Sequence, residues 1–257
     1  MAHNVKGSLD KLSTDKYKIV LVDCAYDTVE EALTTELLGK IAQFKIMSYK
    51  DEYSYRIIPF DKLDIVGAHF LLCEINKAGY EPIVGFKTIT LEQCRKFNIE
   101  FPVFEFLDSK SNLQYENAIY SLIDELHEER QKFGYFGSWT IKKSIRFDHT
   151  LLKFCRELTA AMVMYTFQYF GLNIALTIAV HKLNVSAFHK FLGMQPLTLN
   201  GSELPSFVPK GMMNDECSCA LLRVENIPKE VRQLAQYYQN MWDSRIEIKK
   251  DNIDDIY

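Results

Sequence analysis

The sequence predicts a mixed α/β fold in which helices flank a sheet, and three patterns support this prediction. The first is an apolar β-type run that leads into a helix ended by a glycine. The second is a pair of strand patterns joined by a tight turn. The third is a long uncharged stretch that indicates a buried helix followed by a buried strand. These patterns occupy residues 173–193, 68–91 and 158–180, respectively.

The other elements follow from local signals. A helix is predicted after Thr28, because Thr28 and Glu31 have the spacing of a capping box. A C-terminal helix is predicted from Pro228, since proline suits the first turn of a helix. Its apolar face covers either the sheet or a second subunit, so a homodimer stays open. The predicted strands and extended segments are 18–23, 55–60, 68–75, 81–91, 136–146, 173–180 and 217–224, and the further helices are 117–133, 150–170, 184–192 and 228–246.

The composition is that of an ordinary folded protein. The chain has 257 residues, of which 47% are hydrophobic and 25% charged, so it can bury a sizeable core. No repeat or linker divides it, and we expect a single domain over 1–257 with its core at about 18–226. The formal net charge of −4 gives no electrostatic footprint for binding nucleic acid.

The cysteines and the uncharged stretch bear on the compartment. The six cysteines form no Cys-x-x-Cys pair, so we expect no metal site. With no signal peptide at the N-terminus, we expect a cytoplasmic protein with reduced thiols. Residues 158–180 are long enough to span a bilayer. Gln168, Gly171 and Asn173 interrupt them, however, so no transmembrane segment is expected.

The segment from Asn173 to Met194 resembles the strand–helix signature of GNAT-superfamily acyltransferases. The resemblance rests on Asn184, Ala187, His189 and the pair Gly193-Met194. It implies a central mixed, mostly antiparallel sheet flanked by helices, with a helical insertion before the fourth core strand. It also implies that a thioester carrier lies in a V between strands 136–146 and 173–180. Asn184 would hold the carrier, and His189 would protonate the departing thiolate.

In this superfamily, the carrier's phosphates bind backbone amides at the start of the long helix. Here that turn contains no glycine, and Asp148 is a predicted N-cap that would compete for the same amides. Residues 142–157 contain five basic and two acidic residues, which favours a phosphate-bearing ligand or an acidic carrier protein, although a solvated charged face has the same pattern. The predicted carrier-binding residues in this turn are Lys143, Ser144, Ile145, Arg146, Phe147, Asp148, His149 and Thr150.

A second resemblance lies upstream, in Phe60-Asp-Lys-Leu-Asp64 and Gly85-Phe-Lys87. It is to the acyl-homoserine-lactone synthase and N-acyl amino acid synthase branch, which carries an Asp-x-x-Asp element followed by arginines on two central strands. Asp61 and Asp64 match the carboxylates, while Lys87 and Lys143 replace the arginines. Thr140 stands where the branch carries a glutamate. Asp-x-x-Asp is also a common turn pattern, so a purely structural interpretation stays open.

Two functions follow from these resemblances. The first is an N-acyltransferase that moves an acyl group to an amine, such as an amino acid, from acyl-CoA or from the phosphopantetheine of an acyl-carrier protein. No permanently bound cofactor or metal is expected in that case. The alternative is a GNAT-shaped protein that has lost catalysis and binds a ligand or partner.

Overall fold

The computed structural model describes residues 14–53, 59–107, 112–181, 186–210 and 218–250, which belong to two compact units. Unit 1 comprises Met1–Lys87, Ser138–Met162 and Gln236–Tyr257, and unit 2 comprises Thr88–Gly137 and Val163–Ala235. Strands β3 (Gly79–Thr90) and β4 (Phe133–Ile141) and helix α6 (His149–Phe170) contribute residues to both units. The prediction of a single domain stays a prediction.

Unit 1 is built on the strand order β10-β1-β2-β3-β4. Strand β1 (Tyr17–Asp23) pairs antiparallel with β2 (Ala68–Asn76) and parallel with β10 (Ile246–Ile248). The helices that accompany them are η3 (Thr14–Lys16), η4 (Ala25–Thr28), α1 (Ala32–Tyr53), α2 (Leu63–Val66), η5 (Lys143–Phe147) and α9 (Gln239–Asp243).

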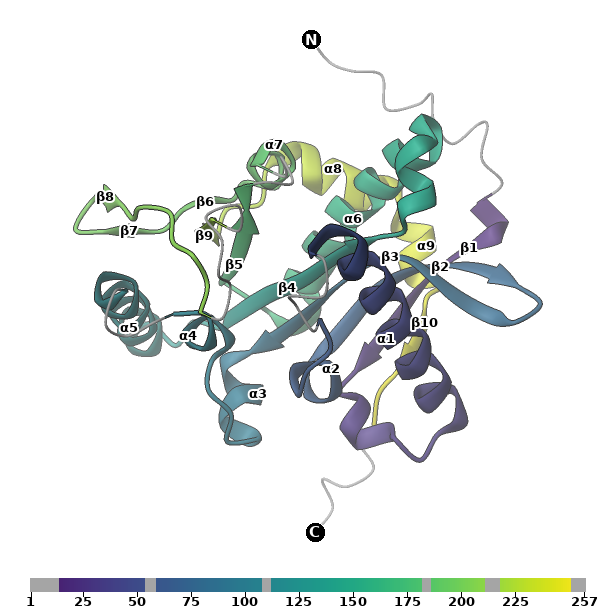
Figure 1. Ribbon diagram of the computed structural model, residues 1–257, viewed down its shortest axis with the longest axis horizontal. Coiled ribbons are helices and arrows are strands. Elements are labelled where there is room, and N and C mark those ends of the chain that lie inside the picture. The colour runs from purple at the N-terminus through teal and green to yellow at the C-terminus, as the bar shows by residue number, and fades with distance from the viewer. Residues whose placement is uncertain (1–13, 54–58, 108–111, 182–185, 211–217, 251–257) are drawn as a thin grey trace. The chain divides into compact units, whose positions relative to one another are not determined.

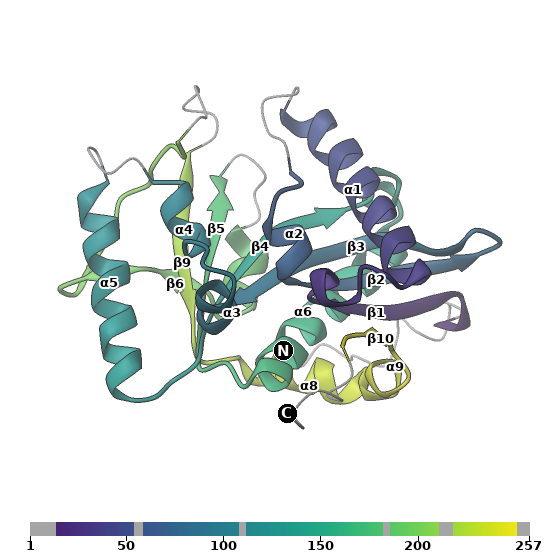
Figure 2. The same ribbon diagram turned by 90° about the horizontal axis from the view of Figure 1, so that it is seen from below.

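Helices α1 and α9 cover opposite faces of β1 and β2 (Figures 1 and 2). On one face, Leu37 and Ile41 of α1 belong to a core cluster with Val20, Val22 and Leu71. On the other face, the Trp242 ring of α9 stacks on Phe70 with ring centroids 6.2 Å apart. Leu37 and Ile41 therefore lie on the buried face of α1.

Unit 2 is built on the strand order β3-β4-β5-β9-β6. Strand β5 (Ile174–Val180) runs parallel to β4 and antiparallel to β9 (Cys219–Val224), and the short β6 (Gln195–Pro196) pairs with β9. A small hairpin joins β7 (Thr198–Leu199) to β8 (Ser202–Glu203). The helices are α3 (Leu91–Lys96), α4 (Pro102–Glu105), α5 (Leu113–Glu128), α7 (Ser186–Phe191) and α8 (Lys229–Tyr237), the last of which ends in unit 1.

Aromatic side chains fill much of the core of unit 2. The Phe101 and Phe133 rings stack with centroids 4.7 Å apart, and Phe136 meets Phe167 edge to face at 5.8 Å. The high phenylalanine and tyrosine content therefore serves core packing here, in keeping with the large buried area of aromatic rings.

The order of strands and helices is largely as predicted, with corrections at element ends. The first helix begins at Ala32, because Thr28 lies in η4 and its hydroxyl accepts a hydrogen bond from Thr34. The strand predicted over 136–146 is β4, which ends at Ile141, and η5 follows it. The helix predicted over 117–133 is α5, which begins and ends earlier.

The C-terminal region differs more from the prediction. The helix predicted over 228–246 divides at Tyr238 into α8 and α9. The chain then forms β10 beside β1, which the sequence did not predict. Among the described helices, none combines the length and apolar character needed to cross a bilayer.

Candidate functional site

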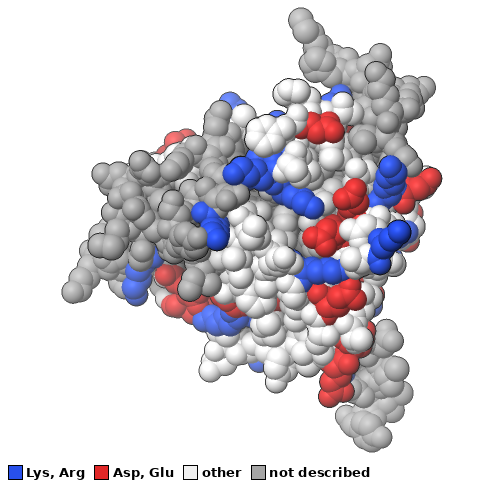
Figure 3. Space-filling view, turned by 45° about the vertical axis from the view of Figure 1, so that its right-hand side comes forward, with Lys and Arg blue, Asp and Glu red and all other residues white. Residues whose placement is uncertain are grey.

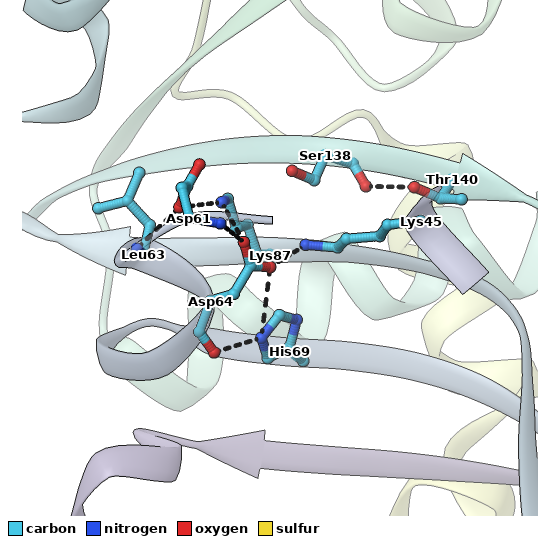
Figure 4. Close-up of polar contacts among 8 residues, drawn as sticks. All are labelled: Lys45, Asp61, Leu63, Asp64, His69, Lys87, Ser138 and Thr140. Atoms are coloured by element: carbon cyan, nitrogen blue, oxygen red, sulfur yellow. Dashed lines mark hydrogen bonds and ion pairs between the residues drawn. The ribbon is translucent and has the colours of Figure 1, made fainter. Parts of the chain in front are cut away.

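Five polar side chains gather in unit 1, between α1 and the strands β2 and β3 (Figure 4). We call them the buried charge cluster; its members are Lys45, Asp61, Asp64, His69 and Lys87. Four of the five are buried, whereas the side chain of Asp61 is 43% exposed. Asp61 is therefore the member of the cluster that a solute can reach.

The Asp-x-x-Asp element forms a tight turn that leads into α2. The amide of Leu63 donates to the Oδ1 atom of Asp61 at 2.8 Å, and the amide of Asp61 donates to the Oδ2 atom of Asp64 at 2.8 Å. The two carboxylates thus satisfy backbone donors at the start of the helix, as short polar residues do in turns. This accounts for the spacing of the element and explains how Asp64 points inward while Asp61 stays at the surface.

Two lysines compensate the two carboxylates. The Lys87 ammonium lies 2.7 Å from the Oδ1 atom of Asp61 and 2.9 Å from the Oδ2 atom of Asp64. Lys45 donates to the other carboxylate oxygen of Asp64. Because buried charges are costly unless paired and hydrogen-bonded, this arrangement permits four charges to lie together inside the unit.

The electrostatic balance sets the protonation states of the cluster. Burial opposes ionisation of Asp64, but Lys45, His69 and Lys87 outweigh it and lower its pKa to about 2. Burial lowers the pKa of Lys45 to about 8, against the favourable charge of Asp64. Burial also lowers the pKa of His69 to about 3, so this imidazole is neutral at physiological pH. The His69 Nε2 atom lies 2.8 Å from the carbonyl oxygen of Asp64, which helps to fix the turn.

The sequence prediction identified three members of the cluster and missed Lys45. The structure brings Asp61, Asp64 and Lys87 together as expected. Lys45 follows Leu37 and Ile41 at four-residue steps along the buried stripe of α1. A lysine on such a stripe needs a buried counter-ion, and this signal could have identified it.

Lys143 does not lie on a strand. It is exposed in η5, beyond the end of β4, so the second cation beside Asp64 is Lys45. Thr140, at the position where the upstream resemblance implies a glutamate, is buried in β4 and donates its hydroxyl to the carbonyl oxygen of Ser138 at 2.8 Å.

The start of α6 is occupied by its own cap. The amides of Thr150 and Leu151 both donate to the Oδ1 atom of Asp148 at 3.0 Å, which confirms the predicted N-cap. The amide of Ile145 is also engaged, since it donates to the carbonyl oxygen of Lys142 at 3.0 Å. A phosphate at this helix start would have to compete with the Asp148 carboxylate for these donors.

The other residues predicted to bind the carrier differ in how far they are exposed to solvent. Ile145 is buried and Arg146 is half-buried. The exposed residues are Lys143, Ser144, Phe147, Asp148, His149 and Thr150. In the same basic segment, the Nζ atom of Lys153 lies 3.7 Å from the Oε1 atom of Glu157. Figure 3 shows basic and acidic side chains interspersed on the face in view.

His189 lies in α7 of unit 2, and its side chain is buried. Burial lowers its pKa to about 4, so the ring is neutral at physiological pH. A proton-donating role would then fall to a neutral imidazole, which is a far weaker acid than imidazolium. The role predicted for His189 stays a prediction, and Asn184 lies outside the described residues.

The described residues contain no group of three or more His, Cys, Asp or Glu side chains that could hold a metal ion. The buried charge cluster can bind a cationic solute, because it presents the Asp61 carboxylate at the surface. The Lys87 ammonium and the amide of Leu63 hold that carboxylate in place through its Oδ1 atom.

Comparison with solved structures identifies the fold. A CoA-dependent acyl-homoserine lactone synthase, BjaI, solved with MTA, is similar over 93% of this chain and 96% of its own, with 12% identity and a TM-score of 0.53. The same synthase solved with SAM and isopentyl-CoA gives equal coverage and identity with a TM-score of 0.52. An acyl-CoA N-acyltransferase from Pseudomonas aeruginosa is similar over 80% of this chain and 98% of its own, with 11% identity and a TM-score of 0.46. No protein-family model matches the chain, and no curated protein sequence matches it.

The chain therefore has the GNAT fold, in the form found in acyl-homoserine lactone synthases. This confirms the predicted fold class, a mixed and mostly antiparallel sheet flanked by helices.

Proposed function

We propose that this protein is an N-acyltransferase that moves an acyl group from an acyl thioester to an amine. The observation that carries the proposal is the buried charge cluster, in which Lys45 and Lys87 hold Asp64 while Asp61 stays open to solvent. The fold shared with a CoA-dependent synthase supports the reaction class. Acyl-CoA is the simplest donor, and an acyl-carrier protein is a second source of the same phosphopantetheine thioester.

The acceptor amine binds as an ammonium beside Asp61. A carboxylate that is exposed on one side and fixed by Lys87 on the other is suited to accept hydrogen bonds from such a cation. An amino acid is one acceptor that carries such an ammonium group.

The reaction needs no protein nucleophile. Once the ammonium loses a proton to solvent, the amine nitrogen attacks the thioester carbonyl, the carbon–nitrogen bond forms and the carbon–sulfur bond breaks. The nitrogen loses its second proton as the amide forms and the departing thiolate takes up one proton, which completes the balance. The protein contributes chiefly by holding the two substrates in reacting geometry.

The basic segment, residues 142–157, is the proposed docking surface of the thioester donor. Exposed charges act over about 10 Å at 0.1 M salt. Lys143→Glu combined with Arg146→Glu should therefore weaken donor binding and reduce its dependence on salt. Unchanged affinity in a folded variant would mean that the segment is only a solvated face.

The proposed function is tested by product formation. The protein is incubated with acyl-CoA thioesters of several chain lengths and a pool of amino acids, and N-acyl products are sought by mass spectrometry. The proposal predicts an N-acyl amine that depends on the protein. Absence of such a product with acyl-CoA and with acyl-carrier protein would contradict it.

One observation favours a second candidate function, a GNAT-shaped binding protein without catalysis. The cap by Asp148 engages two amides at the start of α6. Separate titrations with coenzyme A and with acyl-carrier protein discriminate the two functions. If the protein binds neither donor, the result favours the GNAT-shaped protein without catalysis, which would bind some other ligand or partner.

A further inference from the structure

A pocket of about 300 Å³ lies within unit 2. Its lining residues come from two segments, 164–172 and 225–232. The first segment contains the last turns of α6 and the turn that leads to β5, and the second runs from the end of β9 into α8. We call it the unit 2 pocket. Its volume is that of a site for a small organic molecule.

The inner part of the unit 2 pocket is apolar. Met164 and Phe167 both line it and are spaced so that they lie on one face of α6. Leu172 follows the end of α6, and its amide donates to the carbonyl oxygen of Phe167 at 2.9 Å. Phe167, Leu172 and Ile227 are buried, while Met164 is half-buried. These four side chains offer an apolar surface to the body of a ligand.

The mouth of the unit 2 pocket is polar. Its exposed lining residues are Gln168, Glu225, Asn226 and Arg232. The Oε2 atom of Glu225 lies 2.5 Å from the Nη2 atom of Arg223, so the negative charge of Glu225 is already compensated. The side-chain amides of Gln168 and Asn226 are of the type that donates hydrogen bonds to an anion. Arg232 adds a positive charge, so the mouth favours an anionic group.

Arg232 is held at the mouth by the start of its own helix. Its Nη1 atom donates to the carbonyl oxygen of Ile227 at 2.6 Å. This contact uses only part of the guanidinium, whose further N–H groups form a planar fork that matches a carboxylate. A carboxylate is therefore the anionic group that suits this mouth best.

We propose that the unit 2 pocket binds a small carboxylate with an apolar body, such as a medium-chain fatty carboxylate. The apolar body lies on Met164, Phe167 and Leu172, and the carboxylate pairs with Arg232. The inference goes beyond the proposed function and does not depend on it, because the pocket shares no residue with the buried charge cluster or the basic segment.

Octanoate is the probe for this site, and the side-chain methyl group of Met164 is the reporter. The full chain is isotope-labelled at its methionine methyl groups, and the Met164 signal is assigned with Met164→Leu. That signal should shift as octanoate is added and should saturate with a Kd of about a millimolar or tighter, as expected of a ligand with so few atoms. Met47, which is exposed in α1 of unit 1, provides the reference signal.

Two further ligands separate the contributions of charge and apolar contact. Acetate keeps the carboxylate without the tail. Since each buried methylene is worth about fourfold in affinity, acetate should bind at least about tenfold more weakly than octanoate. Octylammonium keeps the tail with the opposite charge, and it should also bind at least about tenfold more weakly. If either ligand bound as tightly as octanoate, the proposal would be overturned.

Arg232→Gln tests the guanidinium directly. It should weaken octanoate binding by about three- to tenfold, because a charge pair at an exposed mouth contributes less than a buried one. Lys229→Gln is the matched control, since it removes a positive charge from an exposed residue of the same helix that does not line the pocket. This control should change the affinity by less than about twofold. Equal losses from the two variants, or a Met164 signal that octanoate does not shift, would contradict the inference.

Discussion

The buried charge cluster of unit 1 and the environment of His189 in unit 2 show two ways of burying polar groups. In unit 1, two lysines and two aspartates are paired around His69, and one carboxylate reaches the surface. In unit 2, desolvation alone accounts for the lowered pKa of His189. The paired charges form a built site that can bind a substrate, whereas a neutral ring can serve packing without any ligand.

The largest expected effect is the loss of stability when a charge is removed from the buried charge cluster. Asp64→Asn leaves two buried lysines without their shared carboxylate, so it should lower the free energy of unfolding by about 3–5 kcal/mol. Chemical denaturation measures this loss. Glu36→Gln, which removes an exposed partner of Lys40, is the control and should cost less than about 1 kcal/mol. Equal losses from the two variants would contradict the view that the cluster is a buried network.

Acid should destabilise both regions through their histidines. The folded-state pKa values of His69 and His189, about 3 and about 4, lie below the ordinary value of 6.5. The unfolded chain therefore takes up these protons first, and stability is lost as the pH falls below about 6.5, by ~1.4 kcal/mol per pH unit for each histidine.

Denaturation between pH 7 and pH 4 measures this slope. His189→Phe should reduce it by the contribution of one proton. An unchanged slope in that variant would show that His189 does not titrate as its burial implies.

His189 also permits a kinetic test of the comparison. General acid catalysis contributes about 10²–10⁴-fold. Because the ring is buried and neutral, we expect His189→Phe to lower kcat by less than about tenfold, below that range. A loss of a hundredfold or more, with the fold intact, would restore His189 as the proton donor and shift the chemistry toward unit 2.

The smallest expected effect concerns the helix start in unit 1. Asp148→Asn keeps a capping side chain but removes the negative charge. Since a charge near a helix start is worth ~0.3–1 kcal/mol, coenzyme A should bind about two- to fivefold more tightly to the variant. Calorimetric titration measures the change, and weaker binding would mean that the phosphates lie elsewhere.

The sequence predicted most of the fold because the strong signals are local. The Asp-x-x-Asp turn and the Asp148 cap depend on neighbours within a few residues, and both were identified. The end of β4 was misplaced, because residues 139–146 continue a strand-like pattern that gives no sign of η5. Strand β10 was missed, since three residues after a helical pattern provide too little periodicity.

The contacts that complete the site were harder to predict. Lys45 reaches Asp64 across 19 residues of sequence. Such pairs depend on how α1 packs on the strands, which no local pattern encodes. The left-handed Ser138 gives no sequence signal either, because serine is not a residue that this conformation favours.

The most direct test of the account measures how Asp61 affects the acceptor. Initial rates of N-acyl product formation are compared for the wild type, Asp61→Asn and the exposed control Asp124→Asn, at saturating acyl-CoA and varied amine. A hydrogen bond to a charged group is worth ~1.5–3 kcal/mol, so Asp61→Asn should raise the acceptor KM by about ten- to a hundredfold in a variant that still folds. An acceptor KM equal to that of the wild type and of Asp124→Asn would contradict the claim that the buried charge cluster binds the amine.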